Sequence, residues 1–326
     1  MHPPINPSPV ASSFANDVFH YLQLSPRQLP SQYLYDGLGS ALFDAICELP
    51  WYGITRAETR VLARHRTEIF AQLSGLTRLV ELGPGDGRKL LTLMAGISEP
   101  LTAHLVDISP GALARAAHTL SDAPLVTVVT HQASFEDGLD AVTRDLRRPV
   151  KNSDPDGRTL VLMLGSNIGN FDSVASAALL ERICARLAPG DAVLLGADLV
   201  KPEHDLLLAY NDPLGVSAAF NLNVLVRINR ELDGNFDLHG FRHRAVWNAS
   251  CSRMEMFLVS NRRQHVRIGA SGLEMDLEAG EAIWTESSYK YTAEGSIDQL
   301  EAAGFAPVAQ WTDGDAGFAL TLARAI

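Results

Sequence analysis

The sequence predicts an α/β fold, in which a mostly parallel sheet is covered by helices on both faces. From about residue 77, short runs rich in Leu, Val and β-branched residues alternate with segments of helical periodicity. Strands that are so continuously apolar are buried on both faces of a sheet. The rhythm stops near residue 201 and returns close to the C-terminus. The 326 residues therefore suffice for two lobes, or for one lobe with a large insertion.

Each element follows from its own local pattern. The first stretch predicts strands at 78–82, 103–108, 125–130, 159–164 and 192–199, with helices between them at 88–94, 111–120, 139–148 and 173–187. The polar segment 151–157 is expected to be a surface loop. The insertion predicts helices at 205–210 and 218–232 and strands around 244–247, 254–259, 265–268 and 274–277. A helix at 297–303 and strands at 306–312 and 318–323 complete the α/β pattern.

This rhythm divides the chain into three expected parts. Residues 1–13 are rich in Pro and Ser and are expected to be a disordered tail. Residues 14–60 together with 200–290 are expected to form a substrate-binding lobe. Residues 61–199 together with 291–326 are expected to form the α/β domain, and open sheets of this kind bind ligands at the carboxyl ends of their strands.

Composition excludes several classes of partner. The net charge of −11 disfavours binding to nucleic acid and to anionic membrane surfaces. No window approaches 18 consecutive apolar residues, and the first residues lack the pattern of a secretory signal. Three widely spaced cysteines fit a reducing compartment. We expect a cytoplasmic protein without nucleic-acid or membrane partners, and a monomer, since no long amphipathic repeat is present.

A glycine-rich loop follows the first predicted strand. Gly83, Gly85 and Gly87 are spaced G-x-G-x-G, ahead of a predicted helix. Glycine allows the backbone to turn sharply and to approach a ligand closely. The spacing differs from the G-x-G-x-x-G of dinucleotide-binding proteins. Asp86 within the loop also disfavours a pyrophosphate and favours a cationic cofactor such as S-adenosylmethionine (SAM).

Acidic and aromatic residues at neighbouring strand ends support a nucleotide-type ligand. Glu81 precedes the loop, and Asp107 ends the second strand 20 residues after Gly87, where a carboxylate can accept from both ribose hydroxyls. The alternative to ribose binding is that Asp107 only caps the following helix. Ser134 and Phe135 follow the third strand and are candidates for adenine contact, although core packing of Phe135 is equally compatible. The candidate cofactor residues are Glu81, Gly83, Gly85, Gly87, Lys89, Asp107, Ser134 and Phe135, and a seven-stranded SAM-methyltransferase sheet whose last strand is antiparallel fits the C-terminal elements.

Other chemistries find less support. The fourth strand ends in Leu164-Gly-Ser-Asn-Ile-Gly-Asn170, which lacks the G-x-S-x-G of a nucleophile elbow. No Asn-Pro-Pro-Tyr clamp of nucleic-acid methyltransferases occurs there. His239 and His243 have H-x₃-H spacing suited to zinc, but Gly240 weakens a helix and no third ligand is apparent. We therefore expect no metal.

Further blocks narrow the substrate. They are Tyr35-Asp-Gly-Leu-Gly-Ser-Ala-Leu-Phe43, Leu49-Pro-Trp-Tyr-Gly-Ile-Thr-Arg-Ala-Glu58, Leu207-Leu-Ala-Tyr210, Phe220 to Leu232, Met254-Glu-Met256 and Trp284-Thr-Glu-Ser-Ser-Tyr-Lys290. With these blocks in this order from about residue 30 onward, the chain resembles the histidine-specific Nα-methyltransferase family of ergothioneine biosynthesis. The resemblance implies SAM-dependent trimethylation of free L-histidine to hercynine.

The resemblance also implies individual roles. Asn170 and Tyr210 would hold the substrate carboxylate, and Glu286 and Ser288 would bind the imidazole. Tyr35 and Tyr52 would line the amine and take the catalytic roles. Gly165 would add a backbone contact, and Phe43 and Met256 would form apolar walls, although core packing is the stronger interpretation for both.

Departures from the family pattern leave alternatives open. Where the family has Pro-Glu-Tyr-Tyr-Pro-Thr-Arg, this chain has Trp51, Tyr52 and Gly53 in the middle of the block. An N-methyltransferase for another amino acid or a histidine derivative is therefore the second hypothesis. A ligand-binding homologue without catalytic activity is the third.

Overall fold

The computed structural model describes residues 9–95, 97–146 and 157–326, and internal contacts divide the chain into two units. The first unit comprises Met1–Tyr52 and Pro202–Ser288, and the second comprises Gly53–Lys201 and Tyr289–Ile326. Residues 53–60, 200–201 and 289–290, which were expected in the substrate-binding lobe, thus fall in the second unit.

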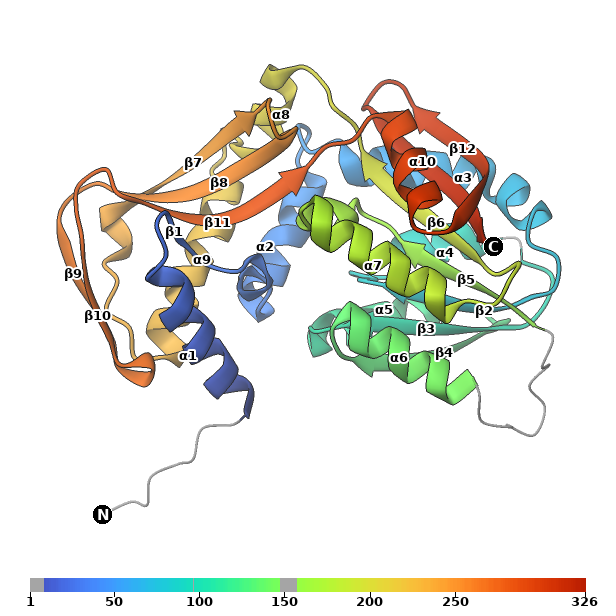
Figure 1. Cartoon of the computed structure of the whole chain (residues 1–326), viewed down its shortest axis with the longest axis horizontal. Coiled ribbons are helices and arrows are strands. Elements are labelled where there is room, and N and C mark those ends of the chain that lie inside the picture. The colour runs from blue at the N-terminus through green and yellow to red at the C-terminus, as the bar shows by residue number, and fades with distance from the viewer. Residues whose placement is uncertain (1–8, 96, 147–156) are drawn as a thin grey trace, which may run out of the picture. The chain divides into compact units, whose positions relative to one another are not determined.

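The second unit is built on a seven-stranded sheet with the order β12-β13-β6-β5-β2-β3-β4 (Figure 1). Its strands are β2 (Leu76–Leu82), β3 (Leu101–Asp107), β4 (Val126–Gln132), β5 (Arg158–Met163), β6 (Ala192–Asp198), β12 (Phe305–Asp313) and β13 (Phe318–Ala325). Strands β2 to β6 are parallel to one another, whereas β13 is antiparallel to both β6 and β12. The predicted seven-stranded SAM-methyltransferase fold, including the antiparallel last strand, is confirmed.

Helices cover both faces of this sheet because its strands are apolar on both sides. Leu79 belongs to a cluster with α3 (Ile54–Ala71), α4 (Arg88–Met94) and α5 (Pro110–Leu120), while the next residue, Val80, joins a cluster with α6 (Phe135–Leu146), α7 (Ser173–Arg186) and α10 (Ala293–Ala302). Successive strand residues point to opposite faces. The alternation seals two cores and leaves the carboxyl ends of the strands as the ligand-binding edge.

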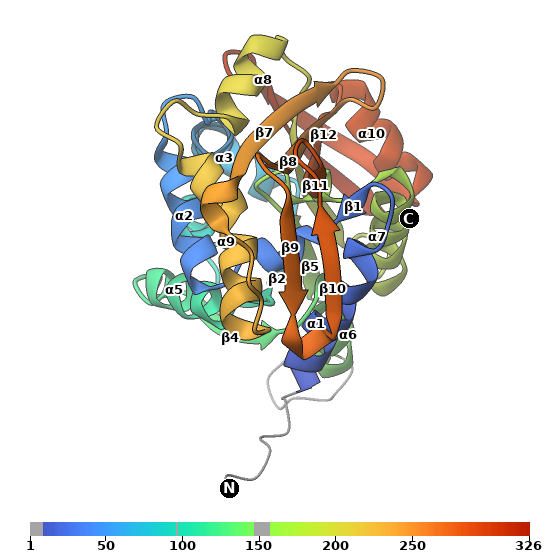
Figure 2. The same ribbon diagram turned by 90° about the vertical axis from the view of Figure 1, so that its left-hand side faces the viewer.

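The first unit contains a four-stranded sheet with the order β1-β11-β8-β7 and a separate β10-β9 hairpin (Figure 2). Its strands are β1 (Arg27–Gln28), β7 (Phe241–Asn248), β8 (Arg253–Ser260), β9 (Gln264–Ile268), β10 (Leu273–Leu277) and β11 (Ala282–Tyr289), and its helices are α1 (Pro9–Leu22), α2 (Gly37–Glu48), α8 (Glu203–Tyr210) and α9 (Val216–Glu231). Helix α9 contacts α2, β7 and β8. It is therefore central to this unit.

Three local expectations need correction. Residues 9–13 belong to helix α1 and not to a disordered tail; residues 1–8 lie outside the described residues. Helix α6 begins at Phe135 and not at residue 139, because Ser134 accepts the amide of Asp137 and caps the helix. The sequence predicted no residue range for strand β11. Of the predicted surface loop at 151–157, only Gly157 is described, and it is buried.

Candidate functional site

The glycine loop of the second unit has the backbone that only glycine adopts easily. Gly83, Gly85 and Gly87 have φ values of +78°, +60° and +80°. A Cβ added to Gly83 would lie 2.5 Å from Asn167 Nδ2 and 3.3 Å from Phe135 Cζ. The loop therefore needs glycine both for its conformation and for the close approach of its neighbours.

Two carboxylates stand at the strand ends beside this loop. Glu81 is fully buried, and neither of its carboxylate oxygens has a hydrogen-bond partner among the described residues. Burial raises the pKa of Glu81 to about 7, although attraction to Lys89 opposes this shift. Asp107 accepts the Ser109 amide at 2.8 Å, and burial raises its pKa as well. A buried carboxylate without a partner fits a cationic ligand such as SAM.

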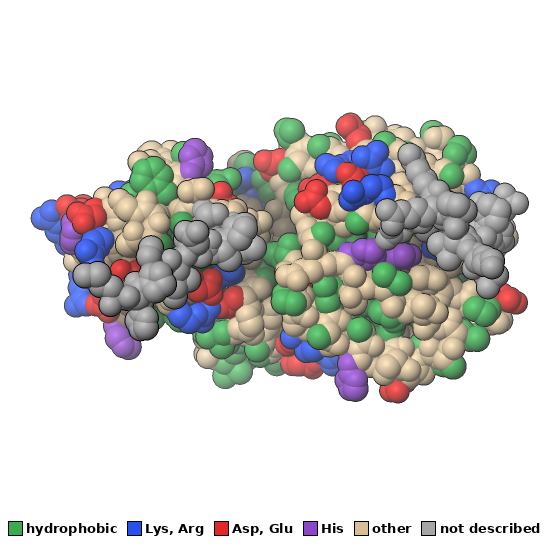
Figure 3. Space-filling model, turned by 90° about the horizontal axis from the view of Figure 1, so that it is seen from below, with side chains coloured by type: hydrophobic (Ala, Val, Ile, Leu, Met, Phe, Trp, Pro, Cys, Tyr) green, Lys and Arg blue, Asp and Glu red, His purple; other side chains and the backbone are tan. Residues whose placement is uncertain are grey.

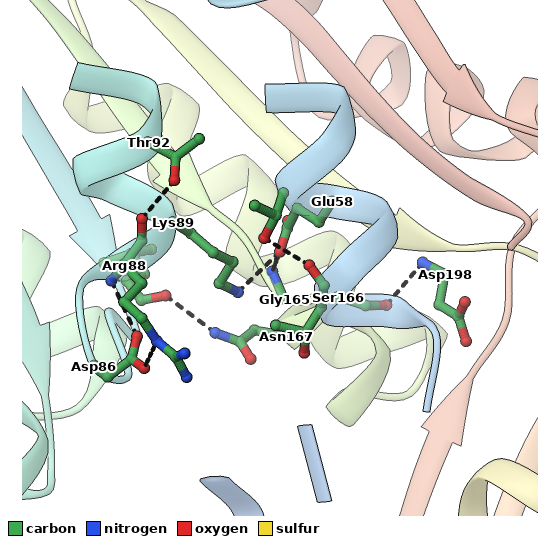
Figure 4. A network of polar contacts seen from close by, with 12 residues as sticks. Glu58, Asp86, Arg88, Lys89, Thr92, Gly165, Ser166, Asn167 and Asp198 are labelled. Carbon is green, nitrogen blue, oxygen red and sulfur yellow. Dashed lines mark hydrogen bonds and ion pairs between the residues drawn. The ribbon is translucent and has the colours of Figure 1, made fainter. Parts of the chain in front are cut away.

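Lys89 is held by a carboxylate that was not among the candidate residues. Glu58 on α3 is fully buried, and its Oε2 lies 2.8 Å from Lys89 Nζ. Both carboxylate oxygens of Glu58 also accept the Gly165 amide, each at 2.8 Å. In Figure 4, Glu58 stands between the lysine and the turn that contains Gly165. The Gly165 amide is thus engaged inside the protein.

The turn after β5 is anchored on its other side as well. The backbone of Ser166 has the left-handed conformation, with φ +56°. Its Oγ accepts a hydrogen bond from the Asp198 amide at 2.9 Å (Figure 4). Asp198 is fully buried and pairs with Lys201 at 2.6 Å and with Lys290 at 2.9 Å. Asn170 ends the following 3₁₀ turn and is exposed. The anchored turn fixes where the main chain of Gly165 lies.

Ser134 and Phe135 are engaged within the fold. The Ser134 Oγ accepts the amide of Asp137 at 3.1 Å, which uses the hydroxyl as a cap. Phe135 is half-buried, packs against the core and lies beside Gly83. The ring therefore borders the glycine loop, where an adenine contact remains a prediction.

In the first unit, candidate residues from distant segments form one connected aromatic cluster. Phe43 lies 5.6 Å from Tyr35 and 6.2 Å from Tyr52, and Tyr52 lies 6.2 Å from Tyr210, measured between ring centroids with near-perpendicular planes. Such edge-to-face geometry is favourable. Phe220 on α9 completes the cluster, at 5.3 Å from Tyr35.

The cluster extends to the strand that carries Glu286. The Tyr210 hydroxyl lies 2.8 Å from Ser288 Oγ, and either oxygen can donate. Glu286 and Ser288 are two positions apart on β11, so their side chains project from the same face of the strand. Met256 is buried and packs in the small cluster that Tyr210 borders. The structure thus joins Tyr35, Phe43, Tyr52, Tyr210, Met256 and Ser288 within one unit.

Two residues of these networks had no predicted role, and the sequence carries a signal for one of them. Glu58 falls on the buried stripe of α3 that includes Ile54, Val61 and Leu62, so it is a charge at an apolar position. Phe220 belongs to a quoted block but had no assigned role. A charged residue in a buried stripe is the pattern to look for.

His243, one half of the H-x₃-H pair, has partners other than a metal. It lies on strand β7 and contacts Asn221 and the Tyr210 carbonyl. Over the described ranges, no group of three or more His, Cys, Asp or Glu side chains could hold a metal ion.

None of the described helices is long and apolar enough to cross a membrane.

Comparison with known proteins agrees with the geometry. A family model described as histidine-specific methyltransferase, SAM-dependent, matches residues 14–325. Histidine N-alpha-methyltransferases of Mycolicibacterium smegmatis and Mycobacterium tuberculosis are 39% and 38% identical, covering 96% and 94% of this chain and 95% and 93% of theirs. Ergothioneine biosynthesis protein 1 of Neurospora crassa is 29% identical over 89% of this chain and 32% of its own length. The chain belongs to the SAM-dependent histidine-specific methyltransferase family.

Proposed function

We propose that this enzyme transfers three methyl groups in succession from SAM to the α-amino nitrogen of free L-histidine. The product is hercynine, and the reaction is the first step of ergothioneine biosynthesis. The observation that carries the proposal is the cluster of Tyr35, Tyr52, Tyr210 and Ser288, which brings four separate segments together in the first unit. Family membership supports the same substrate.

The roles of the substrate residues follow from their chemistry. Tyr210 and Asn170 would bind the carboxylate, and Glu286 and Ser288 would bind the imidazole. The hydrogen bond between Tyr210 and Ser288 supports this assignment, because it couples the two halves of the recognition site. The Gly165 carbonyl is the backbone group proposed to contact the substrate. Phe43 and Met256 would exclude water from the apolar side.

The reaction is an in-line displacement, so the protein mainly orients a neutral amine and removes water. SAM, when bound, supplies the sulfonium methyl group. Each round starts from a deprotonated nitrogen, and Tyr35 and Tyr52 are the proposed groups that orient the amine and help move its proton. After the third transfer the nitrogen has no N–H, so recognition through the carboxylate and imidazole must be sufficient.

The second unit holds the proposed cofactor residues. Glu81 would face the positive charge of the cofactor, and Asp107 would accept hydrogen bonds from the ribose hydroxyls. Lys89 would attract the carboxylate of the cofactor. Gly83, Gly85 and Gly87 would allow close backbone approach, with Ser134 and Phe135 near the adenine. The first unit is accordingly proposed as the substrate-binding part and the second as the SAM-binding part.

A different amino-acid substrate is the alternative, and one contact favours it. A Cβ added to Gly53 would lie 3.3 Å from the Ala316 Cβ. Where the family pattern has a tyrosine in this neighbourhood, this chain has Gly53. A competition assay in which another free amino acid is methylated faster than histidine would support this alternative.

Replacing the proposed imidazole partner tests the assignment. Glu286→Ala should lower the specificity constant for histidine by roughly 10–200-fold, since a hydrogen bond to a charged group contributes about 1.5–3 kcal/mol. Glu274→Ala, at an exposed strand position of β10, is the matched control and should leave turnover unchanged. Unchanged histidine turnover in Glu286→Ala would exclude the assigned role.

A further inference from the structure

The C-terminal end of α8 is held by a side chain from the neighbouring strand. Tyr210 is the last residue of α8, and the last carbonyls of a helix lack partners within the helix. His243 Nε2 on β7 lies 2.9 Å from the Tyr210 carbonyl oxygen. This bond fixes the main chain of the residue whose phenol meets Ser288.

A buried amide in turn orients the His243 ring. Asn221 on α9 is 2% exposed, and its Nδ2 lies 2.9 Å from His243 Nδ1 and 3.2 Å from the Phe257 carbonyl oxygen. A carbonyl only accepts, so the NH₂ group of Asn221 must face Phe257 and His243. His243 Nδ1 is therefore the acceptor, and its Nε2–H donates to Tyr210.

These hydrogen bonds require a neutral His243 ring, and the burial of the ring favours the neutral form. Burial lowers the pKa of His243, although the Tyr210 carbonyl and the Asp212 carboxylate favour the charged form. Asp212 itself accepts the amides of Leu214, Val216 and Ser217, which pins the connection from α8 to α9. The segment after Tyr210 is thus held from two sides.

We propose that Asn221 and His243 are positioning residues that hold Tyr210 in the orientation required for substrate binding. The inference rests on the proposed function, which assigns Tyr210 to the substrate carboxylate. Neither residue needs to touch the substrate. Asn221 selects the tautomer of His243, His243 fixes the Tyr210 carbonyl, and the fixed main chain directs the phenol toward Ser288.

Two isosteric substitutions separate the bonds. The amide nitrogen of Gln occupies about the place of the imidazole Nε2, so His243→Gln keeps a donor for Tyr210. The amide of Asn reaches only the place of Nδ1, so His243→Asn keeps an acceptor for Asn221 and loses the donor. His239→Gln is the matched control, because His239 is exposed on the preceding 3₁₀ turn.

The readouts are the KM for histidine, kcat, the dissociation constant for SAM by calorimetry, and hydrogen exchange of residues 207–215. For His243→Asn we expect the KM to rise about tenfold and exchange in 207–215 to accelerate, with SAM affinity unchanged. His243→Gln should stay within about threefold of the wild type, and His239→Gln should be unchanged. In a Tyr210→Phe background, His243→Asn should raise the KM for histidine by a smaller factor than it does in the wild type.

Equal losses in the Gln and Asn variants, or a parallel loss of SAM binding, would overturn the positioning role and indicate general damage to the fold. An unchanged KM in His243→Asn would also overturn it. If the wild type fails to methylate histidine, the proposed function fails, and hydrogen exchange in 207–215 still decides whether His243 holds this segment.

Discussion

Glu81 is the residue at which burial and charge conflict most directly. Its carboxyl is fully buried, and its pKa is raised from 4.5 to about 7. A raised carboxyl pKa means that the native state favours the protonated form. The associated stability is fully present below about pH 4.5 and is lost as the pH rises to about 7.

We therefore expect Glu81→Gln to be more stable than the wild type at pH 8, by up to about 3 kcal/mol, and about equally stable at pH 4.5. Urea unfolding at both pH values checks this difference. The same variant should bind SAM more weakly, because an amide does not attract a cation. A stability difference that is independent of pH would contradict the account of Glu81.

The buried ion pair between Glu58 and Lys89 is expected to support SAM binding. Glu58→Gln removes the buried negative charge beside Lys89 and places an amide donor against either Lys89 or the Gly165 amide (Figure 4). The affinity for SAM should fall by about 10–100-fold, as expected for a broken buried pair. Calorimetry measures this change. The control Glu68→Gln, at an exposed position of the same helix, should bind SAM as the wild type does. An unchanged SAM affinity in Glu58→Gln would show that Lys89 needs no carboxylate partner.

At the scale of elements, strand β11 places the proposed imidazole-binding residues. Ser288 is buried and bonded to Tyr210, whereas Ser287 is half-buried and projects from the other face. Ser288→Ala should raise the KM for histidine by about 5–10-fold, while Ser287→Ala should leave it unchanged. Steady-state kinetics on both variants decide the matter, and equal effects would argue against the strand register as the source of specificity.

The same strand shows where prediction from sequence ends. The strands of the parallel sheet were predictable because they are apolar on both faces, and β2 to β6 lie within about two residues of their expected positions. Strand β11 carries Thr285, Glu286, Ser287 and Ser288 in a row, so its polar residues mask the alternating pattern. Polar residues that serve a site weaken the signal of the element that carries them.

Other features of the site could not be predicted from the sequence because they depend on tertiary contacts. Residues Tyr35 and Tyr52 were identified through the resemblance, but their contact through Phe43 depends on packing between segments. The sequence marks Glu58 only as a charge on an apolar stripe, because its partners, Lys89 and Gly165, come from other segments of the chain. The glycine loop was predictable because its conformation is local.

At the scale of the whole molecule, the charge distribution agrees with a small-molecule substrate. On the face shown in Figure 3, acidic and basic side chains occur in small interspersed groups. The net charge of −11 comes from 38 acidic against 27 basic residues. A field of this sign does not attract polyanions. The expected partner is a free amino acid.

The proposed activity is the transfer of three methyl groups to the α-nitrogen of free histidine. The most direct measurement is mass spectrometry of a reaction that contains the purified protein, SAM and an equimolar mixture of free amino acids. We expect histidine alone to gain three methyl groups, with fragmentation placing them on the α-nitrogen. Methylation of another amino acid, or no methylation of histidine while SAM binds, would contradict the claim.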